Sequence, residues 1–467
     1  MSILDWDGLK THLTERLRQA AADYIEVRIE AAESSSLRFR GPKLESLEEN
    51  IGLGGCVRAL SSDGWGFAAF NSLDEIDRRI DHAIHLAELA GQNRNRRIQL
   101  APVPVISDVV RPTVKSDPRK VSLADKLNRF QDYNRQILNH REDVTSSVVS
   151  YGDRKSRIIF INNEGTLIDQ VKYDIGGALV AIATRGADTQ MGTVPFGSSN
   201  DYDVSAGLEE RIAGACDTAA DLLEAPSVPG GQYTVIAAPQ MAGIFAHEAF
   251  GHLSEADDLM DNPRMQKVMK LGRRFGNDFL TIYDTGDTPG SRGHMRYDDE
   301  GVAATRADLI REGVLVGRLH SRQSAATLNE APTGNARALN YRFPPICRMR
   351  NTRIEPGDAT LEDMLKGIKK GLYVITPYGG QTDDEMFTFM AGKSYYIENG
   401  TLAGLVRDVN LTGNVFHTLN EIDMVGREVE TDEGAGGCGK GAQSPLPVGN
   451  WAPHIRINNV TVGGQSQ

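Results

Sequence analysis

The stretch from Ala246 to Leu253 reads Ala-His-Glu-Ala-Phe-Gly-His-Leu and places two imidazoles and a glutamate within an apolar run. Zinc proteases carry two histidines one helical turn apart with a glutamate beside the first, because neutral imidazole binds Zn²⁺ and the carboxylate takes a proton from water. Here His247 and His252 are five positions apart, one more than in that motif. In a regular α-helix this spacing turns the two rings about 140° away from each other.

A local change in the helix could bring the two imidazoles together. Gly251 could end the helix just before the second histidine, or the extra residue could form a single π-helical turn, a feature found at functional sites. A shared metal site therefore predicts an interruption of the regular helix near Gly251. The alternative is two ordinary histidines on a partly buried helix with a solvated Glu248, and the spacing alone leaves both interpretations open.

A catalytic zinc ion usually has three protein ligands, so a third ligand must come from elsewhere in the chain. The acidic cluster of Glu255, Asp257 and Asp258 could supply a carboxylate, although such clusters are more often solvated surface. The other candidates are His294 and Cys438. The cysteine stands between glycines, which allow close backbone approach, and a lysine two positions later favours its thiolate form.

The glycine-rich segment around the cysteine also comes close to a phosphate-binding loop. Gly434 and Gly439-Lys440 match the P-loop pattern except at its last position, where Gly441 replaces Ser or Thr. The acidic residues before this segment and the prolines after it predict neither the strand nor the helix that such a loop requires. We therefore reject a nucleotide site here.

Length, composition and charge bound the class of protein. A chain of 467 residues, 40% hydrophobic and 24% charged, is long enough for two or three globular domains. The net charge of −12 argues against a general affinity for nucleic acid or anionic membrane. The N-terminus lacks a signal-peptide pattern, no run approaches the roughly 20 apolar residues of a membrane span, and four scattered cysteines do not suggest disulfides. We therefore expect a cytoplasmic protein.

Hydrophobic periodicity divides the chain into two parts. Residues 1–225 alternate helix and strand patterns and are predicted to form an α/β domain, and the Pro- and Gly-rich stretch 225–231 is the predicted linker. Residues 232–467 show mostly hairpin patterns, with the His-Glu helix and a second helix at about 361–372. The predicted fold class is α+β, in which a curved or barrel-like antiparallel sheet of the second domain carries the metal-binding helix.

Five separated segments of the second half carry motifs in a fixed order. They are His247–His252 (HEAFGH), Asp298–Gly301 (DDEG), Pro332–Asn335 (PTGN), Met349–Thr352 (MRNT) and Gly437–Lys440 (GCGK). Together they resemble the TldD/PmbA family of metalloproteases, and the C-terminal Val460–Gly464 is similar to the family's ending. The resemblance covers the second part of the chain closely and the first mainly in its layout.

The resemblance implies a zinc peptidase that hydrolyses unfolded or extended peptides. In such an enzyme His247, His252 and Cys438 bind the metal, and Glu248 acts as the catalytic general base. The alternative is a non-catalytic regulatory or binding subunit, similar to a gyrase modulator, with a structural metal site. The acidic charge makes direct DNA binding the weaker interpretation.

The resemblance also implies a dimer. The family has one branch with the His-Glu motif and one without it, and members of the two branches pair. This chain carries the motif and is therefore similar to the TldD branch. We expect it to pair with a motif-lacking PmbA/TldE-like paralogue or with itself, so that a chamber shields the active site from folded proteins.

Overall fold

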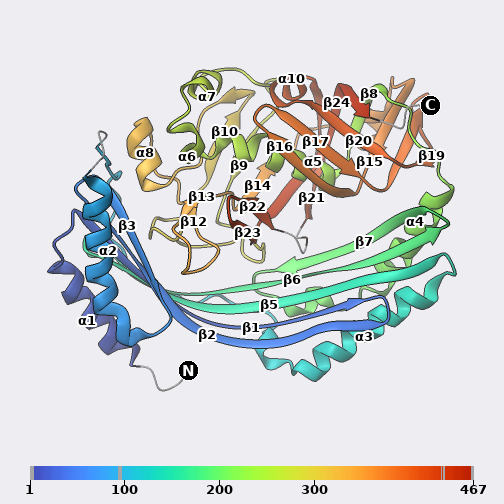
Figure 1. Ribbon diagram of the computed structural model, residues 1–467. Coiled ribbons are helices and arrows are strands. Elements are labelled where there is room, and N and C mark those ends of the chain that lie inside the picture. The colour runs from blue at the N-terminus through green and yellow to red at the C-terminus, as the bar shows by residue number, and fades with distance from the viewer. Residues whose placement is uncertain (1–4, 93–96, 433, 435–436, 464–467) are drawn as a thin grey trace.

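Two large β-sheets, one from each half of the chain, organise the molecule, and in Figure 1 the long N-terminal strands run beneath the C-terminal half. The structure is a computed structural model that describes residues 5–92, 97–432, 434 and 437–463. The motif segments discussed above extend beyond these ranges at Ala435, Gly436 and Gly464.

The described part of the N-terminal sheet has seven strands. They are β1 (Tyr24–Arg40), β2 (Lys43–Ser61), β3 (Gly64–Phe70), β4 (Ser107–Val110), β5 (Val144–Asn162), β6 (Leu167–Arg185) and β7 (Asp188–Ser198). The order is β3-β2-β1-β5-β6-β4, with β7 paired to β6, and every pair is antiparallel except β4 with β6. Because β1, β2, β5 and β6 are 17 to 19 residues long, the sheet reaches across the whole molecule.

Helices pack against this sheet in two groups. They are α1 (Trp6–Arg18), α2 (Ile76–Gly91), α3 (Leu123–His140) and α4 (Glu209–Glu224), with short 3-10 turns η1 (Leu73–Glu75), η2 (Pro118–Lys120) and η3 (Tyr202–Ser205). Ile80 of α2 lies in one apolar core with α1, and Phe130 of α3 lies in another with Ile212 of α4. Ser122 caps α3 by accepting a hydrogen bond from the N–H of Asp125 at 3.1 Å.

Within the described residues the C-terminal sheet has 13 strands. They are β8 (Gly231–Ala237), β9 (Ile282–Asp284), β10 (Ala307–Arg311), β11 (Val314–Leu315), β14 (Asn351–Ile354), β15 (Lys370–Val374), β16 (Pro377–Asp383), β17 (Met386–Ala391), β18 (Ser394–Glu398), β19 (Thr401–Val406), β20 (Val409–Asn414), β21 (Ile422–Asp432) and β24 (Gly449–Gly463). Two small hairpin-like pairs accompany it, β12 (Ala336–Arg337) with β13 (Ile346–Cys347), and β22 (Cys438–Lys440) with β23 (Gln443–Leu446).

The long strand β24 is the centre of this sheet, because it pairs with β8, β14, β20 and β21. The predicted α+β class with a β-rich second half is confirmed. The described part of the sheet is open and does not close into a barrel. It is also mixed, since β14 runs parallel to β24 and β15 runs parallel to β8.

Short helices connect the strands of the C-terminal half. They are α5 (Pro239–Ala246), a π-helical turn η4 (His247–Gly251), a 3-10 turn η5 (His252–Ser254), α6 (Ala256–Leu259), α7 (Pro263–Val268), α8 (Arg322–Leu328), α9 (Leu361–Leu365) and α10 (Val415–Asn420). No helix within the described ranges is long and apolar enough to cross a membrane.

The helix predicted at about 361–372 is wrong in its second half. Thr360 starts α9 with a capping box, but the helix ends at Leu365. Gly367 then has a φ of +81°, a left-handed conformation that terminates helices. Leu372 belongs instead to β15, where it pairs with Val235 of β8. The apolar residues between 361 and 372 recur at intervals that fit a helix. In the structure these positions are divided between a short helix, a turn and a strand.

Buried ion pairs join the two halves of the chain. Arg58 of β2 donates to Glu300 at 2.6 Å, and Arg28 of β1 lies 3.4 Å from Asp299. Both carboxylates belong to the Asp298–Gly301 motif, which therefore lies where the two halves meet.

Arg292 makes a second link between the halves. Its guanidinium donates to both carboxylate oxygens of Asp174 in β6, at 2.7 and 2.9 Å. It also donates to the carbonyl oxygen of Gly434 at 2.5 Å. The N-terminal sheet is thus tied to the segment that leads into Cys438.

Candidate metal centre

The segment with the two histidines changes its winding as the sequence predicts. α5 ends at Ala246, and the N–H of His252 donates to the carbonyl of His247, five positions back, which is the π-helical pattern. The additional residue in this turn brings the imidazoles to one side, with ring centroids 5.3 Å apart and planes at 86°. The predicted interruption of the helix near Gly251 is confirmed.

Close packing holds the π-helical turn in place. A Cβ at Gly251 would lie 2.0 Å from Sδ of Met349, a fully buried residue of the MRNT motif. On its other side, buried Phe250 packs against Phe275 with ring centroids 6.0 Å apart. An alanine at position 251 would therefore require the buried Met349 side chain to shift.

Cys438 reaches the two histidines from the C-terminal part of the chain. Its Sγ lies 3.3 Å from Nε2 of His252, and one ligand atom each of His247, His252 and Cys438 lie within 4.8 Å of one another. Pairing of β22 with β23 and a 2.6 Å hydrogen bond from Arg348 to the Cys438 carbonyl hold the cysteine backbone.

The three donors fit a zinc ion. Tetrahedral zinc with bonds of about 2.0–2.3 Å separates two of its ligand atoms by roughly 3.3–3.6 Å, and the 3.3 Å between Sγ and Nε2 agrees with this. His247 is only 3% exposed, and its Nδ1 has no hydrogen-bond partner among the described residues. A buried polar atom without a partner is unfavourable, and a bound ion would satisfy this ring.

The surroundings of Cys438 favour the thiolate, which is the form that binds metals. Burial alone would raise the pKa of the thiol. Attraction to His247 and hydrogen bonds from His247 and His252 outweigh burial and lower the pKa of Cys438 to about 5.

Glu248 lies beside the three donors and lines a cleft together with His247 and Cys438. Its side chain is 22% exposed, and its Oε2 lies 3.8 Å from Nε2 of His252. Burial raises the pKa of Glu248 above its usual range, although both histidines act in the opposite direction. The carboxylate is thus placed to exchange a proton with a molecule in the cleft.

The acidic cluster lies behind the histidine and not with the three donors. Glu255 is fully buried, and its Oε2 accepts a hydrogen bond from Nδ1 of His252 at 3.1 Å. Lys440 lies 3.2 Å from the same oxygen and also pairs with Asp257 at 2.6 Å and Asp258 at 2.9 Å. Donation from Nδ1 to a carboxylate leaves Nε2 of His252 available for a metal.

His294 is not part of this group. It lines a different cavity of about 130 Å³, where its Nδ1 lies 2.8 Å from the carbonyl oxygen of Gly286. The structure therefore brings His247, His252 and Cys438 together and leaves His294 apart.

His247 and Cys438 line a cleft of about 760 Å³ between the two halves of the chain. Phe196 of β7 lines its N-terminal side, and Tyr378 and Gly380 of β16 line its C-terminal side. Sequence reasoning missed these wall residues. Their strand patterns were visible, but a strand pattern does not indicate which strand will face the metal.

Three models of one family match the chain. PmbA/TldA metallopeptidase domain 1 matches residues 25–87, the central domain matches 114–225, and the C-terminal domain matches 230–464. The chain belongs to the PmbA/TldD family. This family member is 43% identical over 449 residues to a protein of Synechocystis sp. named as a metalloprotease, with 96% of each chain covered.

Two further comparisons place this PmbA/TldD family member. It is 29% identical over 464 residues to the zinc metalloprotease TldD homolog of Saccharolobus solfataricus, covering 96% of this chain and 98% of the relative. The crystal structure of TldE from Thermococcus kodakarensis matches with a TM-score of 0.77 at 17% identity, covering 98% of this chain and 99% of that one. At that identity the structural match shows a shared fold.

Proposed function

We propose that this chain is a zinc-dependent metallopeptidase that hydrolyses unfolded or extended peptides, with Glu248 as general base. The observation that carries the proposal is the meeting of His247, His252 and Cys438 beside the Glu248 carboxylate in a cleft. The names of the relatives support it, because the curated relative from Synechocystis is named a metalloprotease and that from Saccharolobus solfataricus a zinc metalloprotease.

The division of labour follows from the geometry. A zinc ion at these donors would supply Lewis acidity to a water molecule and to the scissile carbonyl. Glu248 takes the proton of that water, and its raised pKa lets it hold the proton before giving it to the leaving amine. Glu255 fixes the orientation of the His252 ring, and Lys440 compensates the buried charge of Glu255.

The strand β16 supports an extended substrate. Among the described strands it pairs only with β17, so its second edge is open to a further strand. It lines the cleft, and Thr382 Oγ1 donates to the Glu248 carbonyl at 2.7 Å, which ties the strand to the π-helical turn. Main-chain hydrogen bonds along such an edge do not depend on side-chain identity, which suits broad specificity.

Variants of Glu248 and His247 test the proposal. Glu248→Gln should keep zinc and lose peptide hydrolysis by about 10²–10⁴-fold, because a general base contributes that much and does not hold the ion. His247→Ala should lose zinc itself. Zinc is quantified on each purified protein, and hydrolysis is followed with an unfolded, fluorescently quenched protein substrate. Hydrolysis by Glu248→Gln within a few-fold of wild type, or equal zinc in both variants, would contradict these roles.

The regulatory alternative differs in its metal site. A structural zinc usually has four protein ligands, whereas three donor residues meet at this site among the residues that the structure describes. Chelation that abolishes hydrolysis supports the peptidase. Stoichiometric zinc without hydrolysis of any unfolded substrate supports the regulatory or binding subunit.

We further propose that the chain works in the cytoplasm as a dimer, with a motif-lacking PmbA/TldE-like paralogue or with a second copy of itself. A peptidase site among cytoplasmic proteins has to be shielded from folded chains, and a second subunit over the cleft would provide this shield. Sedimentation of the native protein, with partner identification by pull-down, tests the assembly. A monomer with full activity at low concentration would refute it.

A further inference from the structure

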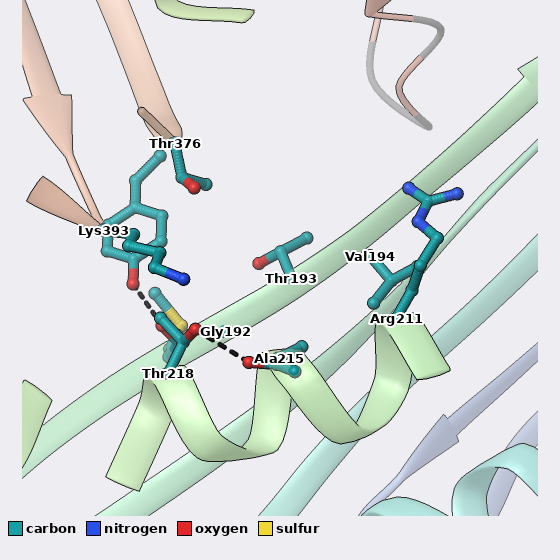
Figure 2. A pocket seen from close by; sticks show the side chains of 11 residues that line it. Gly192, Thr193, Val194, Arg211, Ala215, Thr218, Thr376 and Lys393 are labelled. Atoms are coloured by element: carbon teal, nitrogen blue, oxygen red, sulfur yellow. Dashed lines mark hydrogen bonds between the residues drawn. The ribbon is translucent and has the colours of Figure 1, made fainter. Parts of the chain in front are cut away.

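A second cavity of about 240 Å³ adjoins the cleft and is shown in Figure 2. The two cavities are neighbours, because four residues line both of them: Thr193, Arg211, Thr376 and Tyr378. Figure 2 shows Thr376 and Lys393 on one side of the second cavity and Arg211 on the other, with Thr193 between them. The Tyr378 hydroxyl donates to the Met191 carbonyl and joins the two walls.

Charge is distributed unevenly between the two cavities. Glu248 is the only carboxylate among the described residues that line either cavity, and it stands at the metal centre. Two cations line the second cavity: Lys393, and Arg211, which also lines the first cavity and donates to the Pro195 carbonyl. Two cations in one cavity are notable in a chain with a net charge of −12.

Lys393 lines the second cavity but not the first. It is half-buried, and no carboxylate of the described chain lies within ion-pair distance of its amine. Its amine lies over the Tyr395 ring, 5.8 Å from the ring centroid. A partly buried ammonium group without a counter-ion is suited to an anionic ligand.

The direction of β16 indicates which end of a peptide would reach Lys393. The strand begins beside the second cavity at Pro377 and runs toward the metal centre, where Thr382 contacts Glu248. β16 already pairs antiparallel with β17, and antiparallel pairing is the slightly more stable arrangement. An antiparallel peptide on the open edge would therefore run from the metal centre toward Lys393 with its C-terminus leading.

We propose that Lys393, assisted by Arg211, binds the C-terminal carboxylate of the peptide substrate. The charge of the second cavity agrees with this orientation, because a parallel peptide would bring its ammonium group to the same two cations. The inference rests on the proposed peptidase function and adds a substrate class, peptides with a free C-terminus.

The distance along β16 between the two sites also predicts which peptide bond is cut. Four residue steps separate Thr382 from Tyr378 along β16, a span of about 13 Å at roughly 3.3 Å per residue. A carboxylate held at Lys393 therefore places the scissile bond about three to five residues from the C-terminus.

The test compares three peptides of equal length, one with a free C-terminus, one with a C-terminal amide, and one amide with glutamate at the penultimate position. The zinc-loaded full-length protein should hydrolyse the free acid with a kcat/KM about tenfold above that of the simple amide, in keeping with a hydrogen bond to a charged group. Mass spectrometry should find the cut at a constant distance from the C-terminus.

Substitutions at position 393 complete the test. Lys393→Met should remove the preference for the free acid without changing hydrolysis of the amide, and Lys393→Arg should restore it. Lys369→Met, at an exposed lysine outside both cavities, is the matched control and should behave as wild type. Equal kcat/KM for acid and amide in the wild type, or equal losses for both peptides in Lys393→Met, would overturn the proposal. A preference for the glutamate-containing amide over the free acid would also overturn it, in favour of a side-chain carboxylate.

Binding to the Glu248→Gln protein separates this proposal from the peptidase function. Fluorescence anisotropy with labelled acid and amide peptides reports the carboxylate preference without any turnover. If the wild type hydrolyses nothing while Glu248→Gln still binds the acid about tenfold more tightly, the proposed catalysis fails and the carboxylate site stands. Equal binding of acid and amide refutes the site even if hydrolysis is observed.

Discussion

Cys438 and Glu255 approach His252 from opposite ring nitrogens, and this decides their roles. Sγ of Cys438 is near Nε2, whereas the Glu255 carboxylate accepts from Nδ1. We predict that Cys438→Ser and Cys438→Ala lose stoichiometric zinc. Glu255→Ala should retain zinc with affinity lowered about 10–100-fold, as is usual when a carboxylate that orients a ligand is removed. Competition with a chelating indicator measures both effects.

The control for these variants is Asp258→Ala, because the Asp258 side chain is 64% exposed and, among the described residues, forms an ion pair with Lys440 alone. Its zinc affinity should match that of the wild type. Full zinc content in both cysteine variants together with loss in Glu255→Ala would reverse the two assignments.

At this scale the sequence predicted part of the candidate site. The spacing of His247 and His252 pointed to a shared ion only with a helix interruption, and that interruption is present. The residues alone could not rank Cys438 above Glu255, since the ranking depends on which side of an imidazole each group occupies. That is a property of packing between segments far apart in the chain.

Among the secondary-structure elements, the π-helical turn after α5 depends on one glycine. We predict that Gly251→Ala destabilises the protein by about 1–3 kcal/mol, because its Cβ would overlap Sδ of Met349 in a packed core. The same change should weaken zinc binding by displacing His252. Thermal unfolding and zinc titration of the purified variant measure the two effects.

Gly214→Ala is the matched control for this helical glycine. A Cβ at Gly214 in α4 meets nothing within 4 Å, so the substitution should be neutral or stabilise by about 0.4–1 kcal/mol. Unchanged stability and zinc binding in Gly251→Ala would mean that the turn does not require glycine.

Predictions of helices and strands were correct where the local sequence pattern was strong and wrong where the pattern fitted both. The apolar residues at 361–372 fitted a helix, but Gly367 ends it and Leu372 joins a strand. Leu372 belongs to β15 because this strand pairs with β8, which lies more than a hundred residues earlier. Local hydrophobic periodicity cannot predict a pairing between such distant segments.

For the molecule as a whole, the contact between the two halves depends on buried charge. Arg58 donates hydrogen bonds to Glu26 at 3.3 Å and to Glu300 at 2.6 Å. We predict that Arg58→Met lowers the free energy of unfolding by about 3–5 kcal/mol, since it leaves buried carboxylates without their partner. Chemical denaturation of the variant measures the loss.

Arg78→Met serves as the control, because Arg78 pairs with Glu75 at 3.0 Å while 71% exposed. Exposed pairs contribute about 0–1 kcal/mol, so its denaturation midpoint should stay near that of the wild type. Similar midpoints for the two variants would show that the buried network is not what holds the halves together.

Sequence patterns did not predict how the two halves of the chain pack against each other. An α+β chain with a β-rich second half was predicted correctly, yet Phe196 and Lys393 line adjoining cavities only because the two sheets pack as they do. Neither residue belongs to a motif, and the two are separated by almost two hundred positions in the chain.

Arg292 connects the N-terminal sheet to the cysteine segment, through Asp174 on one side and the Gly434 carbonyl on the other. A force that separates the sheets would therefore pull on the segment that carries Cys438. By thermodynamic reciprocity, an ion bound at Cys438 would strengthen the packing of the sheets by as much free energy as that packing adds to the binding of the ion. The stabilisation of the sheet packing by the ion and the gain in ion affinity from that packing would then be two measurements of the same coupling free energy.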